Sequence, residues 1–130
     1  MGWDFRYLPE HGVVSVKTSG DLDYDATIEF IAAAAAEMQR QGCDRILVDH
    51  RDAVLKLSPT RVYRLPAVEV AHRLDQRSKV AVVLSPSTAR AEDARNYADV
   101  MRHNGLPHRL FADPDAALAW LVDPGSDGPS

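Results

Sequence analysis

Three short apolar runs in the second half of the chain each end abruptly in polar residues, and a helix-like stretch follows each one. Runs of this kind, separated by helical patterns, are typical of parallel strands that are covered on both faces. In such sheets, ligands and partners meet the polar loops just past the carboxyl ends of the strands. The pattern therefore predicts a sheet and also the edge at which a binding site should lie. The runs are RILV at 45–48, closing on Asp49-His50-Arg51, VAVVL at 80–84, closing on Ser85-Pro86-Ser87, and HRLF at 108–111, closing on Ala112-Asp113-Pro114.

The N-terminal region alternates apolar and polar residues with the period of two that is typical of a strand with one buried face. Trp3, Phe5 and Tyr7 share one face, and residues 13–18 alternate again after a turn at 9–12. Two such runs across a short glycine-containing loop predict an antiparallel hairpin. Because an apolar edge strand is usually paired or covered, we also expect a homodimer.

The first helix is bounded by two local signals. Acidic residues precede it, where carboxylates cap free N–H groups, and Gly42 supplies a left-handed stop, so we expect a helix from Asp25 to Gln41. Pro66 interrupts the next helical pattern over 60–76, which predicts two short pieces that meet near Leu65.

The whole order of elements predicts the fold class. A helix ending at Asn104-Gly105 and another beginning after Asp113-Pro114 complete the order ββαβαβαβα. This order indicates an α/β domain in which an N-terminal antiparallel hairpin joins a mostly parallel sheet. We assign the domain to residues 1–122, and the Gly, Pro, Ser and Asp of 123–130 predict a disordered tail.

Composition narrows the class of protein. The formal net charge is -4 and the chain lacks a basic run, so we expect no nucleic-acid partner. No apolar segment is long enough for a membrane span, and the N-terminal residues lack the apolar stretch of a signal peptide, so we expect neither. No internal disulfide is predicted, because Cys43 is the only cysteine. The five histidines are scattered without metal-ligand spacing, so we expect no metal and no cofactor. These features predict a cytoplasmic protein.

Several segments together resemble the SpoIIAA-like (STAS-type) domains of bacteria, the fold of anti-sigma-factor antagonists. The resemblance covers about 3–122. Within the family, the chain is similar to the branch of SpoIIAA-like proteins of unknown function, whose fold is also compared with lipid-binding domains. It implies a non-enzymatic regulatory module that binds a protein partner. The segments are the hairpin closing on Ser19-Gly20-Asp21, ILVDHRDA at 46–53, KVAVVLS at 79–85 and LFADPDAALAWL at 110–121.

Antagonists of that family carry an Asp-Ser pair at the start of the helix after the second parallel strand, and a kinase phosphorylates the serine. Ser58 lies near the corresponding place, but Leu57 stands where the aspartate would be and Pro59 follows. A serine before a proline is typical of a helix cap. We therefore predict that Ser58 caps and that the phosphoserine switch is absent.

The polar residues that follow the apolar runs form the candidate site. His50 and Arg51 suggest a subsite for an anionic or polar ligand, and an alternative is a solvated loop in which Arg51 pairs with a neighbouring aspartate. Ser85, Ser87 and Thr88 could offer N–H groups to the same ligand, with Arg90 at the edge, although helix capping by Ser87 or Thr88 is the better explanation of these hydroxyls.

Catalytic motifs are missing from the sequence. A Ser-His-Asp trio can be drawn from Ser85 or Ser87 with His50 and Asp52, but the Gly-x-Ser-x-Gly signature is absent, so we predict no enzyme. The predicted function is a cytoplasmic protein-interaction module, and the alternative is a small-molecule domain for a lipid-like or anionic ligand. An apolar cavity near the Pro66 break would favour the alternative.

Overall fold

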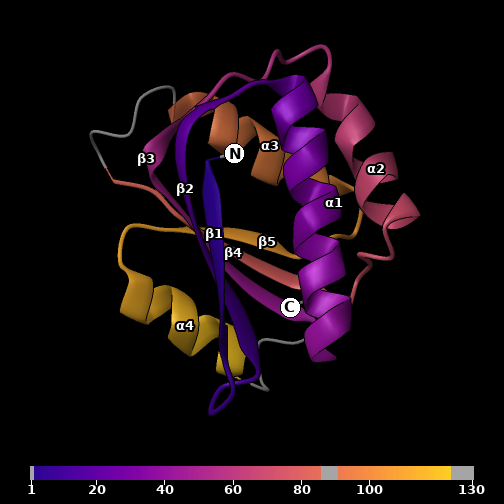
Figure 1. Cartoon of the computed structure of the whole chain (residues 1–130). Helices are drawn as coiled ribbons and strands as arrows, with labels where there is room; N and C mark the ends of the chain where they lie inside the picture. Colours follow the sequence, from indigo (N-terminus) through magenta and orange to yellow (C-terminus); the bar gives the residue numbers. More distant parts are fainter. Residues whose placement is uncertain (1, 86–90, 124–130) are drawn as a thin grey trace.

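The computed structural model describes residues 2–85 and 91–123. Within these residues, five strands form one sheet in the order β1-β2-β3-β4-β5 (Figure 1). The first two strands are antiparallel and every later neighbour is parallel, which confirms the predicted fold class and the order ββαβαβαβα. The strands are β1 (Trp3–Leu8), β2 (Val13–Leu22), β3 (Arg45–Leu55), β4 (Lys79–Val83) and β5 (His108–Phe111).

Helices cover both faces of the sheet. One face carries α1, α2 and α3, and α4 packs alone on the other face against β3 and β4 (Figure 1). The helices are α1 (Tyr24–Gln41), the 3-10 turn η1 (Val62–Arg64), α2 (Leu65–Ala71), α3 (Ala91–His103) and α4 (Pro114–Val122). None of the helices in the described ranges combines the length and the apolar character that crossing a bilayer requires.

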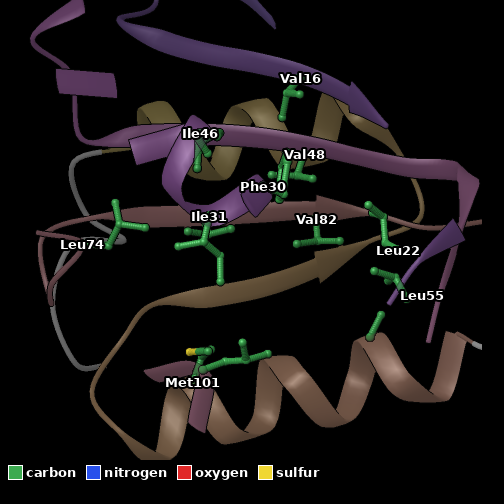
Figure 2. Close-up of a cluster of buried hydrophobic side chains, with 14 of the residues drawn as sticks. Val16, Leu22, Phe30, Ile31, Ile46, Val48, Leu55, Leu74, Val82 and Met101 are labelled. Carbon is green, nitrogen blue, oxygen red and sulfur yellow. The ribbon is translucent and has the colours of Figure 1, made fainter. Parts of the chain in front are cut away.

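Alternate side chains of the central strands pack into two separate apolar cores, one on each face of the sheet. Ile46 and Val48 face the core beneath α1 and α3, whereas Leu47 faces the core beneath α4. The larger core also receives Phe30 and Ile31 from α1 (Figure 2). The apolar runs are continuous because strands covered on both faces need apolar residues at every position.

Helix α1 begins and ends close to the predicted residues. Asp23 is the N-cap and its carboxylate accepts a hydrogen bond from the backbone N–H of Ala26 at 2.8 Å. Gly42 ends the helix with a φ of 68°, the left-handed conformation that glycine adopts at no steric cost. Asp113 caps α4 in the same way, accepting from the N–H of Asp115 at 3.1 Å.

The third strand is longer than the sequence predicted. The polar residues after Val48 were expected to form a loop, but β3 continues to Leu55 and pairs with β2 through Leu22. Lys17 pairs with Asp49 but Ser19 pairs with Asp52, so the extra residue of a bulge lies in this polar stretch of β3. The polar residues therefore mark the point at which one face of the strand meets solvent, and not the end of the strand.

The Pro66 break is confirmed, with one correction to the face that packs inward. The two pieces meet at Leu65, the first being the 3-10 turn η1 and the second α2. The helical spacing of Val68, Ala71 and Leu74 predicts that these residues form the inner stripe of the second piece, but Ala71 is exposed and Glu69 is buried instead. Burial of this carboxylate depends on partners from other elements, which a helical period cannot show.

Three sequence predictions stay predictions. The domain boundary at residue 122 is untested, and the tail over 124–130 lies outside the described residues. The homodimer is also untested, although β1 does lie at an edge of the sheet.

Candidate functional site

Asp49 and Arg51 are paired on the solvent side of β3. The Arg51 Nη2 and Nε atoms donate to the two Asp49 carboxylate oxygens at 2.7 and 2.9 Å, and the Arg51 backbone N–H donates to Asp49 Oδ1 at 3.0 Å. Partial burial would raise the pKa of Asp49, but the hydrogen bonds and charge of Arg51 outweigh it and lower that pKa. The planar guanidinium is therefore engaged within the chain, as the solvated ion-pair alternative describes.

His50 points the opposite way, into the larger core, because successive residues of a strand face opposite sides. It is 6% exposed, and its Nδ1 atom lies 2.6 Å from the Thr18 hydroxyl, which donates to the Asp49 carbonyl at 3.1 Å. Its ring meets Phe30 edge-on at 6.0 Å between centroids. Burial lowers the pKa of His50 to about 4, so the imidazole is neutral at pH 7.

The predicted ligand-binding set is therefore divided. His50 and Arg51 face different sides of the sheet. Ser85 is half-buried just beyond β4, and Ser87, Thr88 and Arg90 lie outside the described residues. An anion subsite built from this set stays a prediction.

A second polar cluster, which the sequence did not indicate, lies beneath α2. We call it the Glu69 cluster: Glu69 from α2, Tyr97 from α3 and His108 from β5. The Tyr97 hydroxyl donates to Glu69 Oε2, and His108 Nε2 lies 3.0 Å from Glu69 Oε1. Burial, and then the charge of Glu69, raise the pKa of Tyr97 well above its usual value, so the phenol stays protonated as a donor.

The Glu69 cluster borders a cavity of about 50 Å³ within the larger core. His50 also reaches this cavity, and the rest of its wall is almost entirely apolar. The residues beneath the Pro66 break do not line this cavity: Leu57, Val62 and Leu65 are fully buried. The cavity instead lies deeper, between α1, α3 and the sheet (Figure 2).

Ser58 occupies a turn ahead of η1. Its hydroxyl accepts a hydrogen bond from the Thr60 N–H at 3.2 Å, and its carbonyl accepts from the N–H groups of Arg61 and Val62. Leu57, beside it, is buried, and its backbone N–H donates to the Asp93 carboxylate at 3.0 Å. The side chain of Ser58 is engaged as a local cap.

We expect Ser58→Ala to lower the free energy of unfolding by about 1 kcal/mol, because the Thr60 N–H loses its acceptor. Urea denaturation checks this, and binding to any partner should be unchanged. Thr60→Ala is the matched control, since that exposed hydroxyl makes no side-chain hydrogen bond in the described residues. Stoichiometric phosphorylation of Ser58 in cells, with binding lost in Ser58→Ala, would contradict the capping role.

Within the described ranges, no group of three or more His, Cys, Asp or Glu side chains is arranged to hold a metal ion. Cys43 is half-buried and its thiol faces the Arg45 carbonyl at 3.6 Å. Asp52, from the imagined catalytic trio, pairs with Lys17 at 3.2 Å on the surface. His50 and Asp52 are thus each engaged elsewhere.

The order of the elements, the antiparallel hairpin and the mostly parallel sheet are those that the sequence predicted. No family model matches the chain, and no curated protein matches it. Among solved structures, the anti-sigma factor antagonist SpoIIAA in its unphosphorylated form matches 89% of this chain and 94% of its own, at 16% identity and a TM-score of 0.47. We base the fold class on the observed strand pairing and take function from this chain's own residues.

Proposed function

We propose that the chain is a non-enzymatic regulatory module that binds an acidic, partly apolar protein segment through the outer surface of η1 and α2. One observation carries this proposal. Tyr63 and Val70 are the two large apolar residues that stand exposed in the described part of the chain, at 69% and 59%, and both lie on this segment. Exposed apolar residues that gather in one place are typical of interaction sites.

The same surface is basic although the chain as a whole is acidic. We define the α2 face as Tyr63, Arg64, Ala67, Val70 and Arg73, all exposed. Neither Arg64 nor Arg73 has an acidic partner among the described residues, whereas Glu69 of the same helix is buried inward. An apolar surface edged by unpaired guanidinium groups is complementary to a segment that carries carboxylates beside apolar side chains.

Arg73 adds a further indication. It follows α2 with a φ of 69°, the one residue other than glycine with a positive φ in the described ranges. Glycine is the residue that this position favours, and an arginine there costs about 1 kcal/mol of backbone strain. Arg73 also lines an open groove of about 160 Å³ beside the C-terminal end of α1. The strained backbone of Arg73 and its place at the groove support a role for its side chain on the surface.

The substitution Arg73→Gly separates binding from stability. We expect it to leave the free energy of unfolding unchanged or to raise it by up to about 1 kcal/mol, because glycine relieves the strained φ. We expect it to weaken binding of a synthetic Glu- and Leu-rich amphipathic peptide at least tenfold at low salt, measured by amide chemical shifts. Arg95→Gly, at an exposed position of α3, is a charge-matched control for binding.

Shifts that cluster at the α2 face in the wild type, and that weaken in Arg73→Gly but not in Arg95→Gly, support the proposal. Shifts elsewhere, or none at millimolar peptide, overturn it. Shifts of the same residues on concentrating the protein alone would show that a second copy covers the face. Equal binding of a Lys- and Leu-rich peptide would remove the charge argument.

The alternative function, binding of a small molecule, is favoured by a separate observation. The cavity beside the Glu69 cluster is apolar and lies inside the larger core, apart from the α2 face. The two functions therefore use different parts of the molecule and can be tested independently.

A further inference from the structure

We propose that the cavity beneath α2 is a binding site for a small, uncharged, mainly apolar molecule that carries one hydroxyl group, and that this hydroxyl donates to Glu69. This inference rests on the small-molecule function above and is independent of the α2 face. It specifies the chemical class of the ligand and the residue that orients it.

The first step is the state of the Glu69 carboxylate. The residue is 2% exposed, and its side chain lines the cavity. A carboxylate has about four acceptor positions, and in the described residues two donors reach it, the Tyr97 hydroxyl and His108 Nε2. A buried carboxylate with acceptor positions to spare attracts a further donor. The cavity is the space beside Glu69 in which that donor would lie.

The second step is the character of the remaining wall. Apolar side chains from α1, α3 and the sheet surround the space, and Figure 2 shows several of them as sticks. An apolar wall holds water poorly, because a buried water needs two to four polar partners. A ligand with an apolar body and one hydroxyl fits both parts of the cavity. Examples of the wall are Phe30, Ile31, Leu74 and Val82.

The third step excludes an anionic ligand from this cavity. Glu69 would repel a second carboxylate, and none of the described arginine or lysine side chains lines the cavity. The other titratable residues that line it are His50, which is buried and hydrogen-bonded to Thr18, and Tyr97 and His108, which both contact Glu69. The ligand class is thereby narrowed from lipid-like or anionic to uncharged.

Size sets the scale of the ligand. The cavity measures about 50 Å³, whereas an engineered apolar cavity of about 150 Å³ admits benzene or xenon. The site as it stands suits a short alkyl chain, and an extended lipid would require the helices to move apart.

The test uses two probes of equal chain length that suit a cavity of this size, ethanol and acetate, with xenon as a purely apolar probe. We expect ethanol to shift the methyl and amide signals of the lining residues with at least tenfold higher affinity than acetate. This comparison needs only the wild-type protein. Equal or stronger binding of acetate would overturn the inference, while shifts with xenon would still support the small-molecule function.

Two variants locate the site. Ala34→Leu adds volume at a lining residue of α1 and should abolish the shifts with all probes, whereas Ala36→Leu, exposed on the same helix, should leave them unchanged. Glu69→Gln should reduce the preference for ethanol over acetate at least tenfold, because the charge is removed and an amide donor appears. An unchanged preference in a folded Glu69→Gln would overturn the role of Glu69. If no probe, xenon included, shifts the lining residues, both the inference and the small-molecule function fail.

Discussion

We expect Lys79→Met to lower the free energy of unfolding by about 3 kcal/mol and to loosen α4 before the rest of the fold. Lys79 begins β4 and is only 3% exposed. Its ammonium group donates to the carbonyls of Trp120, Leu121 and Asp123 at 3.0, 3.3 and 3.2 Å, and lies 4.9 Å from the Trp120 ring centroid. Carbonyls at the end of a helix lack donors within it, and a cation there also suits the helix dipole.

Methionine is the informative replacement because it keeps the length and apolar packing of the lysine stem while removing the donors and the charge. Urea denaturation measures the stability, and hydrogen exchange of the amides of α4 shows which part opens first. Lys56→Met is the control, since Lys56 forms an exposed ion pair with Asp21 and such pairs contribute at most about 1 kcal/mol. Unchanged exchange in α4 would contradict the capping role of Lys79.

The elements could be predicted from the sequence because their signals are local. The helix caps, at Asp23, Gly42 and Asp113, act on backbone groups within a few residues of themselves. The continuous apolar runs indicate strands that are covered on both faces. The end of β3 could not be predicted in the same way. The polar sequence of 49–52 predicts a loop, but the segment is part of a strand because β2, far away in the sequence, pairs with it.

The burial of polar residues could not be predicted from periodicity, because it depends on contacts between residues far apart in the sequence. Glu69 meets His108 across 39 positions of sequence, and Lys79 meets Trp120 across 41. Charged residues are rarely buried without a partner, so neither residue was an expected member of the core. One local signal for Glu69 was nevertheless present, since it follows the apolar Leu65 by four residues and therefore shares a helix face with it.

The stability of the protein should also fall as the pH is lowered from about 6.5 to about 4, because of His50. The pKa of this imidazole is about 4 in the folded protein and 6.5 when it is unperturbed. Across that window the unfolded chain binds a proton that the folded protein does not, so acidification favours unfolding. At 1.36 kcal/mol per pKa unit, the loss amounts to about 3 kcal/mol, and this contribution is constant above and below the window.

The experiment compares urea denaturation at pH 7 and at pH 4.5 in the wild type and in His50→Asn, whose amide keeps a polar group near the Thr18 hydroxyl but does not titrate. We expect the variant to be less stable at pH 7 and to lose much less stability on acidification. His11→Asn, at an exposed position in the β1–β2 turn, should keep the wild-type dependence. Carboxylates whose pKa is lowered, such as Asp49, act in the same direction but below this window. If His50→Asn and the wild type lost equal stability between the two pH values, the buried, neutral imidazole could not be the cause.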